Sequence, residues 1–116
     1  MNRCVGLTMK MTNLLERKLI GVDPFWVVRI DYSPLTAKLC LDLTPEPESG
    51  IVTRRAIFSG VTTCKTDYFD AVGDADYMPT VIGVLSAQKG AQQKIVVTTD
   101  AFEMTFDCAG EPEIEV

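Results

Sequence analysis

The sequence contains no histidine, so the side chain that most often acts as a general base or acid near neutral pH is missing. It also contains no G-x-S-x-G nucleophile elbow and no glycine-rich phosphate loop. A carboxylate pair could do acid–base work, but one member would have to be buried to raise its pKa, and the aspartates here lie in polar sequence. We therefore expect a protein without enzymatic activity.

The cysteines are few and scattered. Structural zinc is usually bound by closely spaced ligand pairs, and no C-x-x-C pair is present. The chain is also long enough to bury a core without disulfides or metals. We expect no cofactor and no metal, and four unpaired, structural thiols: Cys4, Cys40, Cys64 and Cys108.

Basic residues are outnumbered, with 11 Lys and Arg against 16 Asp and Glu and a net charge of −5. This charge disfavours nucleic acid, whose phosphates need a basic face, and anionic membrane surfaces. It favours a protein partner with a basic surface. No apolar run approaches the roughly 18 residues of a membrane-spanning helix, and no signal peptide is recognisable. We expect a cytoplasmic protein with a single domain over residues 1–116, in which residues 1–10 form a frayed tail.

One helix is predicted over residues 13–20. Met11, Leu15 and Leu19 share one face, while Leu14 and Ile20 widen that face. Asn13 with Glu16 fits a capping box, and Thr12 is an alternative N-cap. Gly21 and Pro24 then end the helix. Because this helix is amphipathic, we expect it to cover a sheet.

The rest of the chain alternates between apolar and polar residues, as strands do. We predict strands over residues 25–32, 36–43, 51–64, 80–88, 94–100, 101–108 and 113–116. Gly60, inside the third run, is interpreted as a bulge that bends the strand. The short connections predict an α+β fold, with one N-terminal helix on a strongly curved, mostly antiparallel sheet of about six or seven strands and partial barrel character. Dimerisation is the alternative way to cover the apolar face.

The stretch "KTDYFDAVGDADYMP", residues 65–79, most resembles a site. Its spacing does not match an EF-hand calcium loop. The interleaved aromatic residues favour a connection that packs on the fold, with Asp67 capping a helical turn. We regard the loop as a candidate binding surface formed by Asp67, Tyr68, Asp70, Asp74, Asp76 and Tyr77.

Arginines inside strands need partners, because an unpaired buried guanidinium is very costly. Arg54 and Arg55 are consecutive in a strand, so their side chains point to opposite faces. For Arg29 and Arg55 we expect pairing with acidic neighbours, and a clamp for the carboxylate of a ligand is the alternative.

The segments "IFSGV", "FEMTFDC" and "EIEV" resemble those of small bacterial single-domain β-meander proteins. Many of these are uncharacterised, and some are grouped with the immunity proteins of polymorphic toxin systems. The resemblance covers residues 25–116 and rests on Phe58, Gly60, Val61, Phe106 and Ile114. It implies a binding protein that suits a basic toxin surface, and it transfers no functional residue.

Three hypotheses follow. The first is a non-enzymatic protein-binding domain, immunity-like by resemblance, that uses the outer sheet face or residues 65–79. The second is a small-molecule-binding domain with a cavity between helix and sheet, where Arg29 or Arg55 anchors an anion. The third is a structural subunit that works as a homodimer or larger homo-oligomer.

Overall fold

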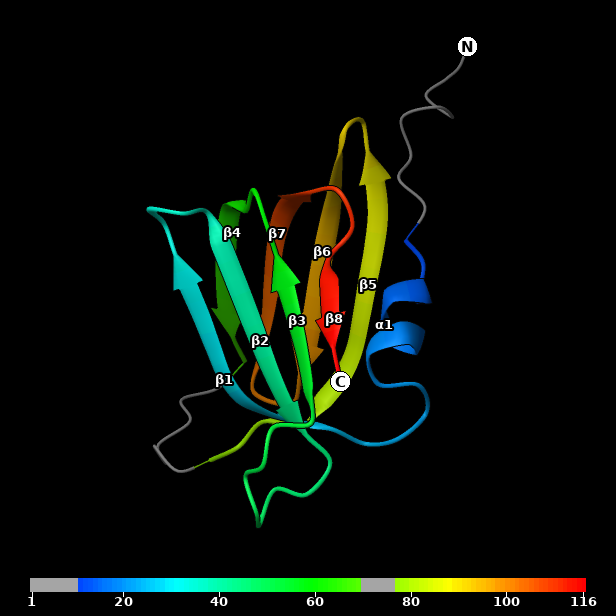
Figure 1. Ribbon diagram of the computed structural model, residues 1–116, viewed down its shortest axis with the longest axis vertical. Coiled ribbons are helices and arrows are strands. Elements are labelled where there is room, and N and C mark those ends of the chain that lie inside the picture. The colour runs from blue at the N-terminus through cyan, green and yellow to red at the C-terminus, as the bar shows by residue number, and fades with distance from the viewer. Residues whose placement is uncertain (1–10, 70–76) are drawn as a thin grey trace.

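Two four-stranded antiparallel sheets and one short helix form the described part of the protein, residues 11–69 and 77–116 of a computed structural model (Figure 1). The elements are α1 (Leu14–Leu19), β1 (Trp26–Ser33), β2 (Lys38–Thr44), β3 (Arg54–Phe58), β4 (Thr62–Tyr68), β5 (Val81–Lys89), β6 (Gln92–Thr99), β7 (Phe102–Ala109) and β8 (Glu113–Glu115). The first sheet has the order β1-β2-β3-β8 and the second β4-β7-β6-β5. All neighbouring strands are antiparallel, as the short connections predicted.

The prediction of one curved sheet with barrel character is wrong. The described residues contain eight strands in two separate sheets, and neither sheet closes into a barrel. The run predicted over residues 51–64 divides at Gly60 into β3 and β4, which belong to different sheets. Gly60 has φ +64°, and a Cβ there would lie 2.7 Å from the Cβ of Ala109. Gly60 is therefore a corner between the sheets, where only glycine fits without strain, and not a bulge within one strand.

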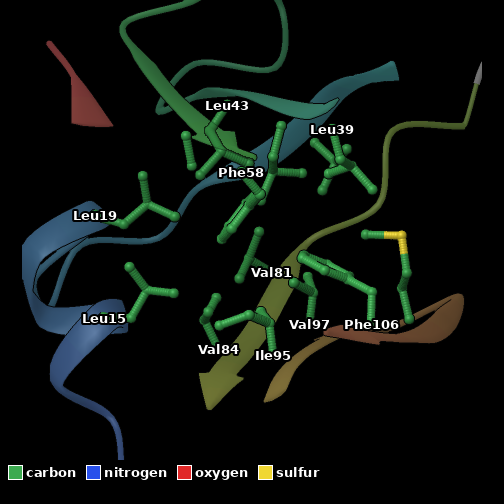
Figure 2. Packing of buried hydrophobic residues seen from close by; sticks show 14 of the residues in the cluster. Leu15, Leu19, Leu39, Leu43, Phe58, Val81, Val84, Ile95, Val97 and Phe106 are labelled. Atoms are coloured by element: carbon green, nitrogen blue, oxygen red, sulfur yellow. The ribbon is translucent and has the colours of Figure 1, made fainter. Parts of the chain in front are cut away.

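The core lies between the two sheets. Leu39, Leu41 and Leu43 of β2 point inward, and Phe102, Met104, Phe106 and Cys108 of β7 face them from the second sheet, so the predicted alternation is confirmed in both strands. At the centre the rings of Phe58 and Phe106 meet edge to face, with their centroids 4.9 Å apart (Figure 2). The sheets thus cover each other's apolar faces, as in a β-sandwich.

The helix closes one edge of this sandwich instead of covering a sheet face. It lies beside β5 (Figure 1), and Leu15 and Leu19 point from it into the core (Figure 2). Leu14, predicted to widen the apolar face, is 58% exposed. The sheets already bury one another, so the helix needs only a narrow apolar stripe.

The predicted capping box is also wrong. Asn13 precedes the helix but its side chain makes no capping hydrogen bond. Glu16 instead accepts a hydrogen bond at Oε1 from the backbone N–H of Val84 in β5, at 2.9 Å. Thr12 exchanges two backbone hydrogen bonds with Ser86, at 2.8 and 2.9 Å. The segment around α1 thereby satisfies backbone groups of β5 that would otherwise lie unpaired at the sheet edge. The end of the helix is as predicted, since Gly21 follows it with φ +65°.

Candidate functional site

Within residues 11–69 and 77–116, the opposite edge of the second sheet is open. β4 pairs with β7 on one side, and no strand of the described residues pairs with its other side. The backbone N–H of Phe69 donates to the carbonyl of Ala101 at 3.0 Å, and Tyr68 lies opposite Phe102. Hydrogen-bonded and non-bonded pairs alternate in an antiparallel ladder. Lys65 and Asp67 therefore bond to β7, whereas the backbone groups of Thr66 and Tyr68 point outward from the sheet.

Aromatic side chains gather at this open edge. Tyr68 is 72% exposed although it belongs to the inward-facing row of β4, and its ring lies 6.1 Å from the ring of Phe102, edge to face. Phe69, directly after β4, is also exposed. Figure 1 shows β4 and the edge strand β1 on the side of the molecule away from α1. The open edge thus combines backbone groups that have no partner in the described part of the chain with exposed aromatic rings.

Tyr77 is exposed and fixed by a side-chain bond. Its hydroxyl donates to a carboxylate oxygen of Asp100, the residue directly after β6. The other carboxylate oxygen accepts the backbone N–H of Thr80 at 2.9 Å. The hydrogen bond to Asp100 raises the pKa of Tyr77, because it stabilises the protonated phenol beside a negative charge. Tyr77 was predicted as a site residue, whereas sequence reasoning missed Asp100.

The predicted loop over residues 65–79 begins later than expected. Residues 65–68 belong to β4, so Asp67 lies in a strand and does not cap a helical turn. Asp67 is exposed and lies 3.9 Å from Lys65 in an ion pair. The structure therefore brings Asp67 and Tyr68 together on one edge strand. Asp70, Asp74 and Asp76 lie outside the described residues.

Arg29 and Arg55 lie elsewhere, on the outer face of the first sheet. The strand register aligns Arg29, Asp42, Arg55 and Glu115 across β1, β2, β3 and β8. Arg55 holds the buried carboxylate of Asp42 with two hydrogen bonds, from Nε at 2.6 Å and from Nη2 at 3.2 Å. The hydrogen bond and the charge of Asp42 raise the pKa of Arg55. This is the pairing with acidic neighbours that strand arginines require, and it stabilises the sheet.

The small-molecule hypothesis placed Arg29 or Arg55 in a cavity between helix and sheet, but in the structure these arginines lie away from that cavity. A cavity of about 360 Å³ does lie between α1, the ends of β5 and β6, and β8, but neither Arg29 nor Arg55 lines it. Arg54 occupies the sheet margin, with its guanidinium carbon 5.5 Å from the centre of the Phe25 ring. The prediction that Arg29 or Arg55 anchors an anion in this cavity is therefore wrong.

Burial raises the pKa of the Cys64 thiol, which is the opposite of the shift that activates a nucleophile. Within residues 11–69 and 77–116, no group of three or more Cys, Asp or Glu side chains is arranged to hold a metal ion. No helix in those ranges is long and apolar enough to cross a membrane.

In the described residues, these features define a small antiparallel β-sandwich whose second sheet has one edge closed by the segment around α1 and one open edge at β4. Its fold is similar to that seen in the crystal structure of an uncharacterized protein from Neisseria gonorrhoeae. The TM-score is 0.59 with 11% sequence identity, over 94% of this chain and 98% of the other. No protein-family model and no curated protein matches the chain. The chain thus shares its fold with an uncharacterised bacterial protein of similar size, and the likeness extends to the fold alone.

Proposed function

We propose that the protein is a non-enzymatic protein-binding domain, and that a strand of its partner adds to the open edge of β4. The observation that carries this proposal is the coincidence, on one edge strand, of outward backbone groups at Thr66 and Tyr68 with the exposed ring of Tyr68. Strand addition gains affinity from backbone hydrogen bonds, and pockets or rings at alternate positions give specificity.

The composition of the edge supports binding over simple exposure. Natural sheets blunt their free edges with bulges, charges or covering segments. The bulge between Thr62 and Lys65 restricts strand addition to the stretch after it, and the charged pair of Lys65 with Asp67 lies within that stretch. At the end of that stretch, Tyr68 and Phe69 present large rings, of the kind that anchor interfaces. A short partner strand fits this edge better than a long one.

The partner that suits the charge of this chain has a basic surface. A net charge of −5 accelerates association with a cationic protein, chiefly through the encounter rate. The resemblance of this chain to immunity proteins belongs to this proposal, because it would make a basic toxin one kind of partner.

The experiment begins with a photo-reactive residue in place of Tyr68, which crosslinks the partner in the source cells. The identified partner is then purified and its Kd measured by titration calorimetry. Thr66→Pro removes the outward N–H and leaves the bonds to β7, so we expect an intact fold and binding weakened by about tenfold or more. Thr66→Ala is the matched control, since it keeps the N–H and loses only the side chain.

Two outcomes would overturn the proposal. Equal affinities of Thr66→Pro and the unaltered protein would mean that the partner does not pair with this edge. A concentration-dependent dimer that Thr66→Pro dissociates would make the occupant a second copy of the chain, in favour of the homo-oligomeric alternative.

A further inference from the structure

A second candidate site lies at the closed edge, away from β4. The cavity of about 360 Å³ opens between α1, the ends of β5 and β6, and the segment that leads into β8. We propose that this cavity binds a free amino acid with a large apolar side chain. The proposal is independent of strand addition at β4, because it uses different residues on a different edge.

The walls supply the apolar half of the recognition. Leu14 and Leu15 reach the cavity from the helix, and Pro112 and Ile114 reach it from the segment around β8. These residues come from two separate elements that both line the cavity, so an apolar group inserted there loses contact with water.

The charged pair of the cavity supplies the second half. Lys18 Nζ and Glu111 Oε2 lie 3.7 Å apart, with both side chains more than half exposed. Such an exposed pair is worth at most about 1 kcal/mol, so its two members exchange partners readily. A ligand with one carboxylate and one ammonium group can bond to Lys18 and Glu111 together. This charge pattern matches the backbone end of an amino acid.

The floor is polar and neutral. Ser86, Gln88 and Gln93 line it from the ends of β5 and β6 that lead into the turn at Gly90. The Gln88 amide nitrogen donates to the carbonyl of Gly90 at 2.7 Å, which leaves the amide oxygen to accept from a ligand. The hydroxyl of Thr12 donates to the backbone carbonyl of Ser86 at 3.5 Å, whereas the side chains of Ser86 and Gln93 make no hydrogen bond to another of the described residues. Hydroxyl and amide groups can donate and accept, so they can bond to either end of a zwitterion.

The size of the cavity limits the ligand. Its volume of about 360 Å³ lies at the lower end of the roughly 300–1,000 Å³ usual for small-molecule sites, which suits a ligand as small as a free amino acid.

The test is a titration of the isotope-labelled protein with L-phenylalanine, followed by amide NMR. We expect saturable shifts confined to the amides around Gln88, Gln93 and Ile114. Phenylethylamine lacks the carboxylate and phenylpropionate lacks the ammonium group, and each should bind about tenfold more weakly or worse. Absence of saturable shifts, shifts at other residues, or equal binding of all three compounds would overturn the proposal.

Charge variants provide the second arm. Lys18→Gln and Glu111→Gln should each weaken L-phenylalanine binding about tenfold, since each removes one charged partner of the zwitterion. Lys65→Gln is the matched control, because it removes a similarly exposed lysine from a comparable ion pair at the other edge, and it should leave binding unchanged. All three positions are exposed, so these variants should fold. Unaltered affinity in both cavity variants would refute the assignment.

Discussion

The two edges of the second sheet differ in how their backbone groups are satisfied. At β5, Thr12 supplies a short backbone bridge, Glu16 supplies a side-chain acceptor, and Leu19 fills the gap between the sheets. At β4, no described strand or helix bonds to the outward backbone groups, and the aromatic rings of Tyr68 and Phe69 are exposed. One edge is thus completed by the protein's own chain, while the other carries the groups that a partner could complete.

The largest expected effect comes from opening the closed edge. Leu19 is fully buried, so Leu19→Ala should lower the free energy of unfolding by about 2–5 kcal/mol, through lost burial and a residual cavity. Urea denaturation followed by circular dichroism measures this change. Leu14→Ala, on the same helix but exposed, is the control, and we expect a change within about 0.5 kcal/mol. Equal effects of the two substitutions would contradict the role of α1 in closing this edge of the sandwich.

A smaller loss should follow from removing the acceptor for β5. Glu16→Ala leaves the Val84 N–H without its partner, and we expect a loss of about 1–3 kcal/mol in unfolding free energy. Glu16→Gln retains an acceptor oxygen and should lose less. The same denaturation experiment distinguishes them. If Glu16→Ala were as stable as the unaltered protein, the bond to Val84 would contribute nothing to closing this edge.

Amide hydrogen exchange compares the two edges directly. Val84 and Ser86 should be protected by the segment around α1. Along β4, Thr66 and Tyr68 should exchange about tenfold or more faster than Lys65 and Asp67, because only the latter two point toward β7. Uniform protection along β4 would show that the edge is covered in solution.

The most local effect is the titration of Tyr77. Its raised pKa means that the bond to Asp100 stabilises the fold below the ordinary tyrosine pKa of 10.0, and that this contribution is lost as the pH rises through the higher pKa of the folded state. Asp100→Asn removes the negative charge but keeps an acceptor for Thr80, so the pKa of Tyr77 should fall toward 10.0. Absorbance titration of the phenol measures this pKa. An unchanged value in Asp100→Asn would mean that the carboxylate of Asp100 does not cause the shift.

The sequence predicted the strands better than their arrangement. Alternation placed Leu39, Leu41 and Leu43 on one face, and the turns separated most strands correctly, because these are local properties. The corner at Gly60 was missed, since a glycine within a β run can mark either a bulge or a change of sheet. The choice depends on Ala109, which is distant in the sequence and packs against Gly60.

The candidate sites were predicted only in part. Asp67, Tyr68 and Tyr77 stood out by composition. The open edge itself depends on strand order, which no local pattern reveals. Glu16 matched a capping box by spacing, yet its carboxylate bonds to β5, because tertiary contacts can override a local motif. Likewise, Lys18 and Glu111 are far apart in the sequence and meet only in the folded structure.

The place of β8 has a consequence for folding. β1 and β2 pair across a short turn, and so do β5, β6 and β7. In contrast, β8 pairs with β3, which is distant in the sequence, and places Glu115 opposite Arg55. Such distant pairings lose much chain entropy before they gain contacts, so they tend to form late. The first sheet should therefore acquire its last strand after the second sheet is assembled, and the wall formed by Ile114 should be among the last parts of the molecule to take shape.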